Sequence, residues 1–235
     1  MKWLVRVIGD EYDIRELAKS LNLEDLSITK ESDGYYLSSP LFEGLTESTD
    51  VRQKAKEIMA LLNGAARLEI GIRKPMEVEC IVKICDDGRR QFDMILDAVG
   101  SSKASVDVVI RKADGSTTEM HAVDRISKYF KIALNDSKVA EALNLLQHDL
   151  DWVNLYRIYE VIEEDVGNKE RIVANGWATG KQIKRFKHTA CSPGAAGELA
   201  RHTKETTQPP KDPMTLLEAK AFIESILHNW LYSKT

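Results

Sequence analysis

The first part of the chain alternates short runs of β-branched and aromatic residues with segments whose apolar residues recur at helical spacing. Lys2–Ile8 is the first such run and predicts a strand. A helix is expected next, with Asp13 as the first residue of a capping box. Strands at 26–30 and 34–39 should follow as a hairpin, because residues 31–34 carry the polar side chains and the glycine of a tight turn.

A second helix is predicted by the apolar residues that recur at helical spacing between residues 50 and 63. Glycine readily takes the left-handed conformation found at helix ends, so we expect this helix to stop at Gly64. Residues 67–72 then resemble a returning strand. The resulting order, β-α-β-β-α-β, is that of a ferredoxin-like unit.

Two further hairpins are expected after this unit. The first pairs residues 77–84 with 91–96, and the second pairs 105–112 with 117–123. Both turns contain an Asp-Gly pair, which suits a backbone that needs positive φ. The pattern therefore predicts a mixed or antiparallel sheet with two helices on one face.

The chain changes character near residue 122, and helical patterns replace the strands. The expected helices cover 124–135, 137–146, 152–166, 179–190, 195–203 and a last segment that begins after Thr215. A proline-rich connection, 207–213, precedes the last helix. We therefore expect an α+β fold: an α+β domain over 1–122 and an all-α domain over 123–235.

Length and composition exclude several classes of protein. The chain has 235 residues, of which 43% are hydrophobic and 30% charged, as in ordinary globular proteins of one large or two small domains. No apolar run approaches the ~20 residues of a membrane helix, and the charges at Arg6 and Asp10 do not fit a signal peptide. The three cysteines are unpatterned, which favours reduced thiols. We expect a cytoplasmic protein that does not enter a membrane.

Charge is divided unevenly along the chain. Residues 1–167 carry 22 Lys and Arg against 31 Asp and Glu, a net of −9. Residues 168–204 carry 8 against 2, a net of +6, and residues 205–235 carry 3 against 4. Because the net charge of −4 argues against a general nucleic-acid coat protein, any binding of nucleic acid should be local to this basic island.

One face of the expected helix 179–190 is basic and the opposite face is apolar, at 100° per residue. A phosphate backbone would satisfy the basic face, because Lys and Arg gain free energy by releasing condensed counterions. Alternatively, the face is simply solvated, or the acidic N-terminal part neutralises it. The candidate nucleic-acid-binding residues are Lys181, Lys184, Arg185, Lys187 and Lys204.

Two pairs of arginine and histidine are the candidate catalytic residues. A neutral imidazole, from His202 or His188, could take a proton from a ribose 2′-hydroxyl. The guanidinium of Arg201 or Arg185 could then stabilise the charge that develops on the phosphate. Since Arg201 and His202 are adjacent, they should point about 100° apart on a helix, so one of them could have a structural role instead.

The C-terminal half resembles the HEPN superfamily (higher eukaryotes and prokaryotes nucleotide-binding). The resemblance rests on the basic helix, the Arg201-His202 element, the proline-rich connection and the start of the last helix at residues 213–220. It implies a helical domain within 123–235 and, by analogy, a metal-independent ribonuclease, often dimeric and tied to phage defence or toxin–antitoxin pairs. The family's motif is an arginine followed by a histidine after four to six residues, whereas two residues separate Arg185 from His188 and none separates Arg201 from His202.

Two functional hypotheses follow. The first is an RNA- or nucleotide-binding protein that also cleaves RNA if its arginines and histidines converge. The alternative is a non-catalytic interaction module whose basic island docks an acidic partner, which could be the N-terminal part of a second copy in a homodimer. His188, Cys191 and His202 could supply three zinc ligands, but no Cys-x-x-Cys pair supports such a site. We therefore predict no metal and no cofactor.

Overall fold

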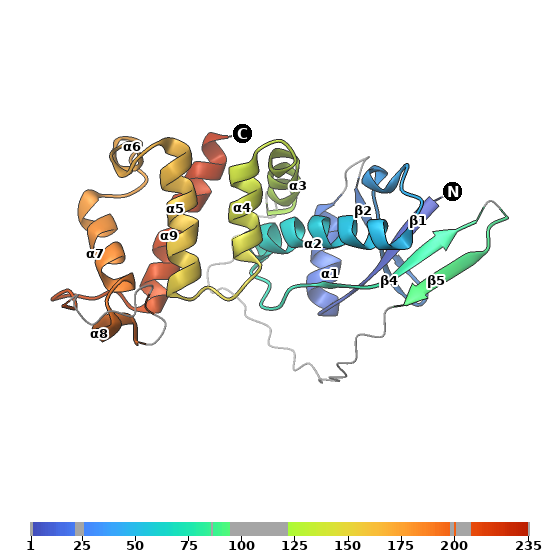
Figure 1. Cartoon of the computed structure of the whole chain (residues 1–235), viewed down its shortest axis with the longest axis horizontal. Helices are drawn as coiled ribbons and strands as arrows, with labels where there is room; N and C mark the ends of the chain where they lie inside the picture. Colours follow the sequence, from blue (N-terminus) through green and yellow to red (C-terminus); the bar gives the residue numbers. More distant parts are fainter. Residues whose placement is uncertain are drawn as a thin grey trace, which may run out of the picture.

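The computed structural model has an α+β fold. It describes residues 2–21, 26–85, 87–94, 122–197, 200 and 208–234. A five-stranded sheet with two helices forms the N-terminal part, and helices form the described chain after residue 121 (Figure 1). None of the described helices is long and apolar enough to cross a membrane.

The sheet is antiparallel throughout, and its strands lie in the order β2-β3-β1-β4-β5. Apart from the added edge strand β5, this is the arrangement of a ferredoxin-like β-α-β-β-α-β unit. The expected first strand and the hairpin at 26–39 are confirmed, and so is the described part of the hairpin at 77–96. The strands are β1 (Lys2–Ile8), β2 (Ser27–Glu31), β3 (Gly34–Ser38), β4 (Glu77–Ile84) and β5 (Arg90–Met94).

The two faces of the sheet bury different residues, as the alternation of side chains along a strand requires. Val5 and Ile81 belong to the large hydrophobic cluster that includes the helices. Leu4, Tyr36, Cys80 and Val82 form a smaller cluster on the opposite face. The helices of the N-terminal part therefore cover one face of the sheet, as the sequence predicted.

The first helix begins earlier than the sequence indicated. Helix α1 spans Glu11–Ser20, and the side chain of Asp10 accepts hydrogen bonds from the backbone N–H groups of Tyr12 and Asp13. The prediction that Asp13 caps this helix is therefore wrong. Asp13 lies inside the first turn, where burial, followed by the nearby Asp10, raises the pKa of its carboxyl group.

Helix α2 is longer than predicted. It spans Ser48–Ile70 and ends at Gly71, whose φ of 72° is left-handed. The expected helix end at Gly64 and the expected strand over 67–72 are therefore both wrong. The β-α-β-β-α-β order survives because β4 supplies its last strand.

Gly64 has a packing role instead of a capping role. A Cβ atom at this position would lie 2.0 Å from the backbone oxygen of Leu143 in helix α4 (Ser137–Leu146). Only a residue without a side chain permits this close approach of two helices.

The C-terminal helices largely follow the predicted pattern, and Gly167 ends the helix that Asp151 begins. The short helix α6 was not predicted, and the helix expected over 195–203 is wrong in its described part, because α8 ends at Ala196 and Gly197 has a left-handed φ of 66°. Residues 95–121, which include most of the expected hairpin 105–123, lie outside the described residues, as do residues 198–199 and 201–203 of the expected helix 195–203. The other helices are η1 (Pro40–Phe42), α3 (Ala122–Ala133), α5 (Trp152–Val166), α6 (Lys169–Ala174), α7 (Gly180–Ala190), α8 (Pro193–Ala196) and α9 (Leu216–Ser233).

One hydrophobic cluster extends across the expected domain boundary at residue 122. It includes Val5 of β1, Leu62 of α2, Leu143 of α4 and Trp230 of α9, all of them fully buried. Helix α2 contacts both α3 and α4 on one side of the boundary and β4 on the other. The described parts of the two expected domains thus share one core, and the division at residue 122 stays a prediction.

Replacing Gly64 by alanine should destabilise the protein. The new methyl group would overlap the Leu143 carbonyl, and overpacking of this kind costs about 1–3 kcal/mol, more than the gain in helix propensity. Denaturant unfolding should therefore show a clear loss for Gly64→Ala. Gly180→Ala is the matched control, because nothing lies within 4 Å of the added Cβ. Equal unfolding midpoints for the two variants would contradict the close approach of α2 and α4.

Candidate functional site

Helix α7 has the two faces that the sequence predicted. Thr179 begins it with a capping box that includes Gln182, which satisfies backbone N–H groups at the start of the helix. Ile183 and Phe186 are buried in the core, whereas Lys181 and Lys184 are exposed.

Arg185 is occupied by contacts within the chain. Its Nε donates to the backbone oxygen of Asp212 at 2.9 Å, and Nη2 donates to the backbone oxygen of Pro213 at 3.0 Å. The guanidinium also pairs with the carboxylates of Asp212 at 3.1 Å and Glu218 at 3.4 Å. Arg185 therefore joins α7 to the proline-rich connection and to the first turn of α9.

His188 is held by the same connection. Its Nε2 lies 2.8 Å from the backbone oxygen of Gln208. A carbonyl oxygen can only accept, so Nε2 carries the proton in this contact and does not act as a base there. Next to it, the backbone N–H of Met214 donates to the hydroxyl of Thr189 at 3.1 Å. One side of α7 thus binds the segment that leads into α9.

Lys187 packs against helix α5. Its ammonium lies 3.1 Å from a carboxylate oxygen of Glu163 and 5.0 Å from the centre of the Tyr159 ring. The phenol of Tyr159 donates to Glu163 at 2.9 Å. Burial, followed by this hydrogen bond, raises the pKa of Tyr159, so its hydroxyl stays protonated.

The structure describes only two of the four candidate catalytic residues, Arg185 and His188. Arg201 and His202 lie outside the described residues, and so does Lys204 of the candidate binding set. Arg185 and His188 are described, and each is used to hold residues 208–218. The catalytic role of these residues therefore stays a prediction.

The basic island, residues 168–204, is less positively charged in the folded protein than its sequence indicates, because acidic residues from other segments lie beside it. No acidic residue occurs between Arg171 and Glu198, but Glu163, Asp212 and Glu218 reach α7 from other segments. These acids pair with Arg185 and Lys187. The expected neutralisation by the acidic N-terminal part is not what the described residues show, because Glu163 belongs to α5 and Asp212 and Glu218 follow the basic island in sequence. Within the described residues, Lys181 and Lys184 have no ion pair.

The aromatic residues near α7 are part of the core. Phe186 packs against Tyr156 and Tyr159 with ring centres 5.9 Å apart in both cases, and Trp152 lies 6.4 Å away. All four side chains are at least nine-tenths buried. They are therefore not available for stacking on the bases of a single-stranded nucleic acid.

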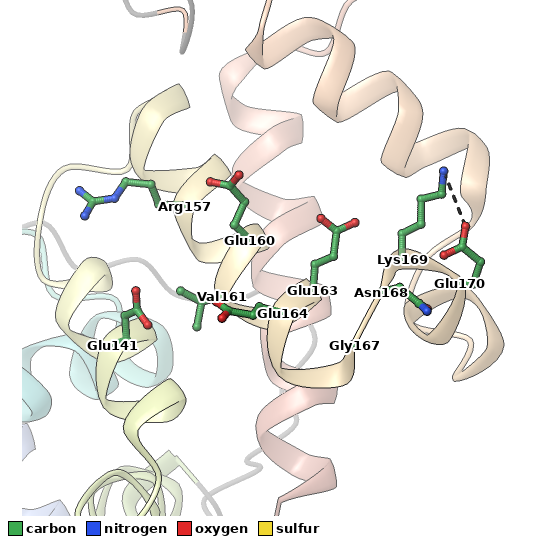
Figure 2. Close-up of a pocket in the computed structure, with 10 residues that line it drawn as sticks. All are labelled: Glu141, Arg157, Glu160, Val161, Glu163, Glu164, Gly167, Asn168, Lys169 and Glu170. Carbon is green, nitrogen blue, oxygen red and sulfur yellow. Dashed lines mark ion pairs between the residues drawn. The ribbon is translucent and has the colours of Figure 1, made fainter.

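A cleft of about 640 Å³ lies along α5, between α4 and α6, and half of its lining residues are glutamates (Figure 2). Its carboxylates have basic neighbours, as in the pair Lys138–Glu164 at 2.6 Å. Within the described residues, no group of His, Cys, Asp and Glu is placed to hold a metal ion. The lining residues are Glu141, Arg157, Glu160, Val161, Glu163, Glu164, Gly167, Asn168, Lys169 and Glu170.

Comparisons with protein-family models, curated proteins and solved structures give no match to this chain. The resemblance to the HEPN superfamily accordingly stays a prediction, and the function has to be argued from the residues themselves.

Arg185→Ala should be clearly destabilising, because it removes the donor to the backbone oxygens of residues 212 and 213 and the ion pairs with Asp212 and Glu218. Hydrogen bonds to charged groups contribute about 1.5–3 kcal/mol, and the Arg185 side chain is only 26% exposed. Lys184→Ala, one position earlier on the exposed face, should change the free energy of unfolding by less than about 0.5 kcal/mol. Similar losses in urea titrations of both variants would show that Arg185 does not hold the connection.

The carboxyl group of Glu218 should make stability fall in acid. Hydrogen bonds from the backbone and side chain of Thr215, followed by the nearby Arg185, lower its pKa below 4.5. The stabilisation is therefore complete above the unfolded-state pKa and is lost as pH falls through the lower folded-state value. Glu218→Gln should reduce the acid-dependent drop in melting temperature, whereas Glu224→Gln on the exposed side of α9 should not. The same drop in all three proteins would refute this role.

Proposed function

We propose that this protein is a non-catalytic interaction module, and that Lys181 and Lys184 on α7 dock an acidic partner protein. The observation that carries the proposal is the use of Arg185 and His188 in holding residues 208–218. A guanidinium that already contacts two carboxylates and two carbonyl groups has little capacity left to stabilise a phosphate transition state.

The position of the two lysines supports an anionic partner. They lie one turn apart in the N-terminal half of α7, where like charges repel and the helix dipole disfavours cations. Carboxylates of a partner would relieve both effects at once. Because the lysines are exposed and unpaired within the described chain, docking would not have to break an existing ion pair.

Nucleic acid fits the described surface less well than acidic protein. Binding of RNA draws its strength from many phosphate contacts and from bases stacked on aromatic rings. The described face offers two free lysines, and its neighbouring aromatic rings are buried. RNA is therefore the competing outcome of the experiment.

The test compares two polyanions of equal charge, a glutamate-rich peptide and a single-stranded RNA, at several salt concentrations. The peptide should bind more tightly, and Lys181→Gln with Lys184→Gln should weaken it about three- to tenfold, as expected for two exposed ion pairs. The control, Lys2→Gln with Lys56→Gln, removes the same charge from exposed positions in the sheet region and should have little effect. Tighter binding of RNA, or equal losses in both variants, would overturn the proposal.

A further inference from the structure

Three helices that are distant in sequence meet at a single buried carboxylate. Glu69, in the last turn of α2, has a side chain that is only 1% exposed. Its two oxygens face basic side chains of different helices: Arg125 Nε of α3 lies 2.6 Å from Oε2, and His228 Nδ1 of α9 lies 3.5 Å from Oε1.

The cluster is poorly arranged for stability alone. Removing a carboxylate from water is costly, and the ion pair with Arg125 offsets only part of that cost. Within the described chain, neither Glu69 oxygen accepts an aligned hydrogen bond. The hydroxyl of the neighbouring Tyr129 interacts with the carboxylate but supplies no charge, since burial and then Glu69 raise the pKa of this phenol to about 12. A buried carboxylate whose hydrogen bonds are this poorly aligned calls for an explanation.

That explanation lies in what Glu69 holds at the surface. The side chains of Arg125 and His228 are 48% and 40% exposed, although the carboxylate between them is buried. Arg125 faces Glu69 through Nε, which leaves donors of its guanidinium for a second acceptor. His228 faces Glu69 through Nδ1, which leaves Nε2. Lys128, one turn after Arg125, is exposed and has no ion pair within the described residues.

We propose that Arg125, His228 and Lys128 form a binding site for a phosphate group, with Glu69 as the residue that positions the arginine and the histidine. A planar guanidinium matches two phosphate oxygens, and an imidazole N–H and an ammonium can reach the others. A phosphate monoester carries between one and two negative charges near neutral pH, which suits a site where the cations Arg125 and Lys128 outweigh one buried acid. The site shares no residue with the lysine face of α7 and does not depend on the docking proposed for it.

The first experiment titrates the whole protein with inorganic phosphate and follows the Arg125 Nε–Hε and His228 ring signals by NMR. Both signals should shift and saturate together, whereas sodium chloride at equal ionic strength should not reproduce the shift. His228→Gln and Lys128→Gln should each weaken phosphate about threefold or more. The control, Lys181→Gln with Lys184→Gln, should bind as the original protein does. Shifts that do not saturate, or that all variants share, would overturn the site.

The variant Glu69→Gln distinguishes a positioning role of Glu69 from a purely electrostatic one. If Glu69 only opposes anions, its neutralisation should tighten phosphate binding. If it positions Arg125 and His228, binding should weaken although a negative charge has been removed. We expect the second result, with the melting temperature recorded to confirm that the variant is folded. Should Glu69→Gln unfold, the NMR titrations of His228→Gln and Lys128→Gln still decide whether the site exists.

Discussion

The contact between α2 and α4 at Gly64 is the constraint on which the rest of the structure depends. One side of helix α2 covers the sheet and another side packs on α3 and α4. Through α2, the β-strands and the C-terminal helices share one hydrophobic core. The approach is so close that only glycine fits against the Leu143 backbone. This contact sets the positions of α3 and α4, and therefore of Arg125 on α3. Because α4 packs on α5, the contact also affects the position of the helices that surround α7.

The basic residues of α7 illustrate how a charged segment can serve its own fold. Arg185 and His188 donate hydrogen bonds to backbone carbonyl oxygens of the connection that precedes α9. Lys187 forms an ion pair with Glu163 on α5. These contacts use groups that catalysis would need free. Lys181 and Lys184 remain, and they suit attraction of an anionic surface rather than a chemical step.

The second basic surface, formed by Arg125, Lys128 and His228, could not be found from the net charge of sequence segments. Arg125 and Lys128 belong to the stretch 1–167, whose net charge is −9, and His228 lies far away in sequence. Folding brings them near one another because α2, α3 and α9 meet at Glu69. The two surfaces therefore differ in kind: one follows from neighbours along a helix, and the other exists only through the packing of three helices.

The sequence by itself determined the α+β class, most of the described strands and the starts of α5, α7 and α9, since Asp151, Thr179 and Thr215 act on backbone groups within a few residues. Such signals are local, and so they can be recognised from spacing. The tertiary structure decided that Gly64 packs instead of ending a helix, and that acids from distant segments reach α7. It also created the Glu69 cluster. These features depend on which helices become neighbours, and hydrophobic packing across the whole core decides that.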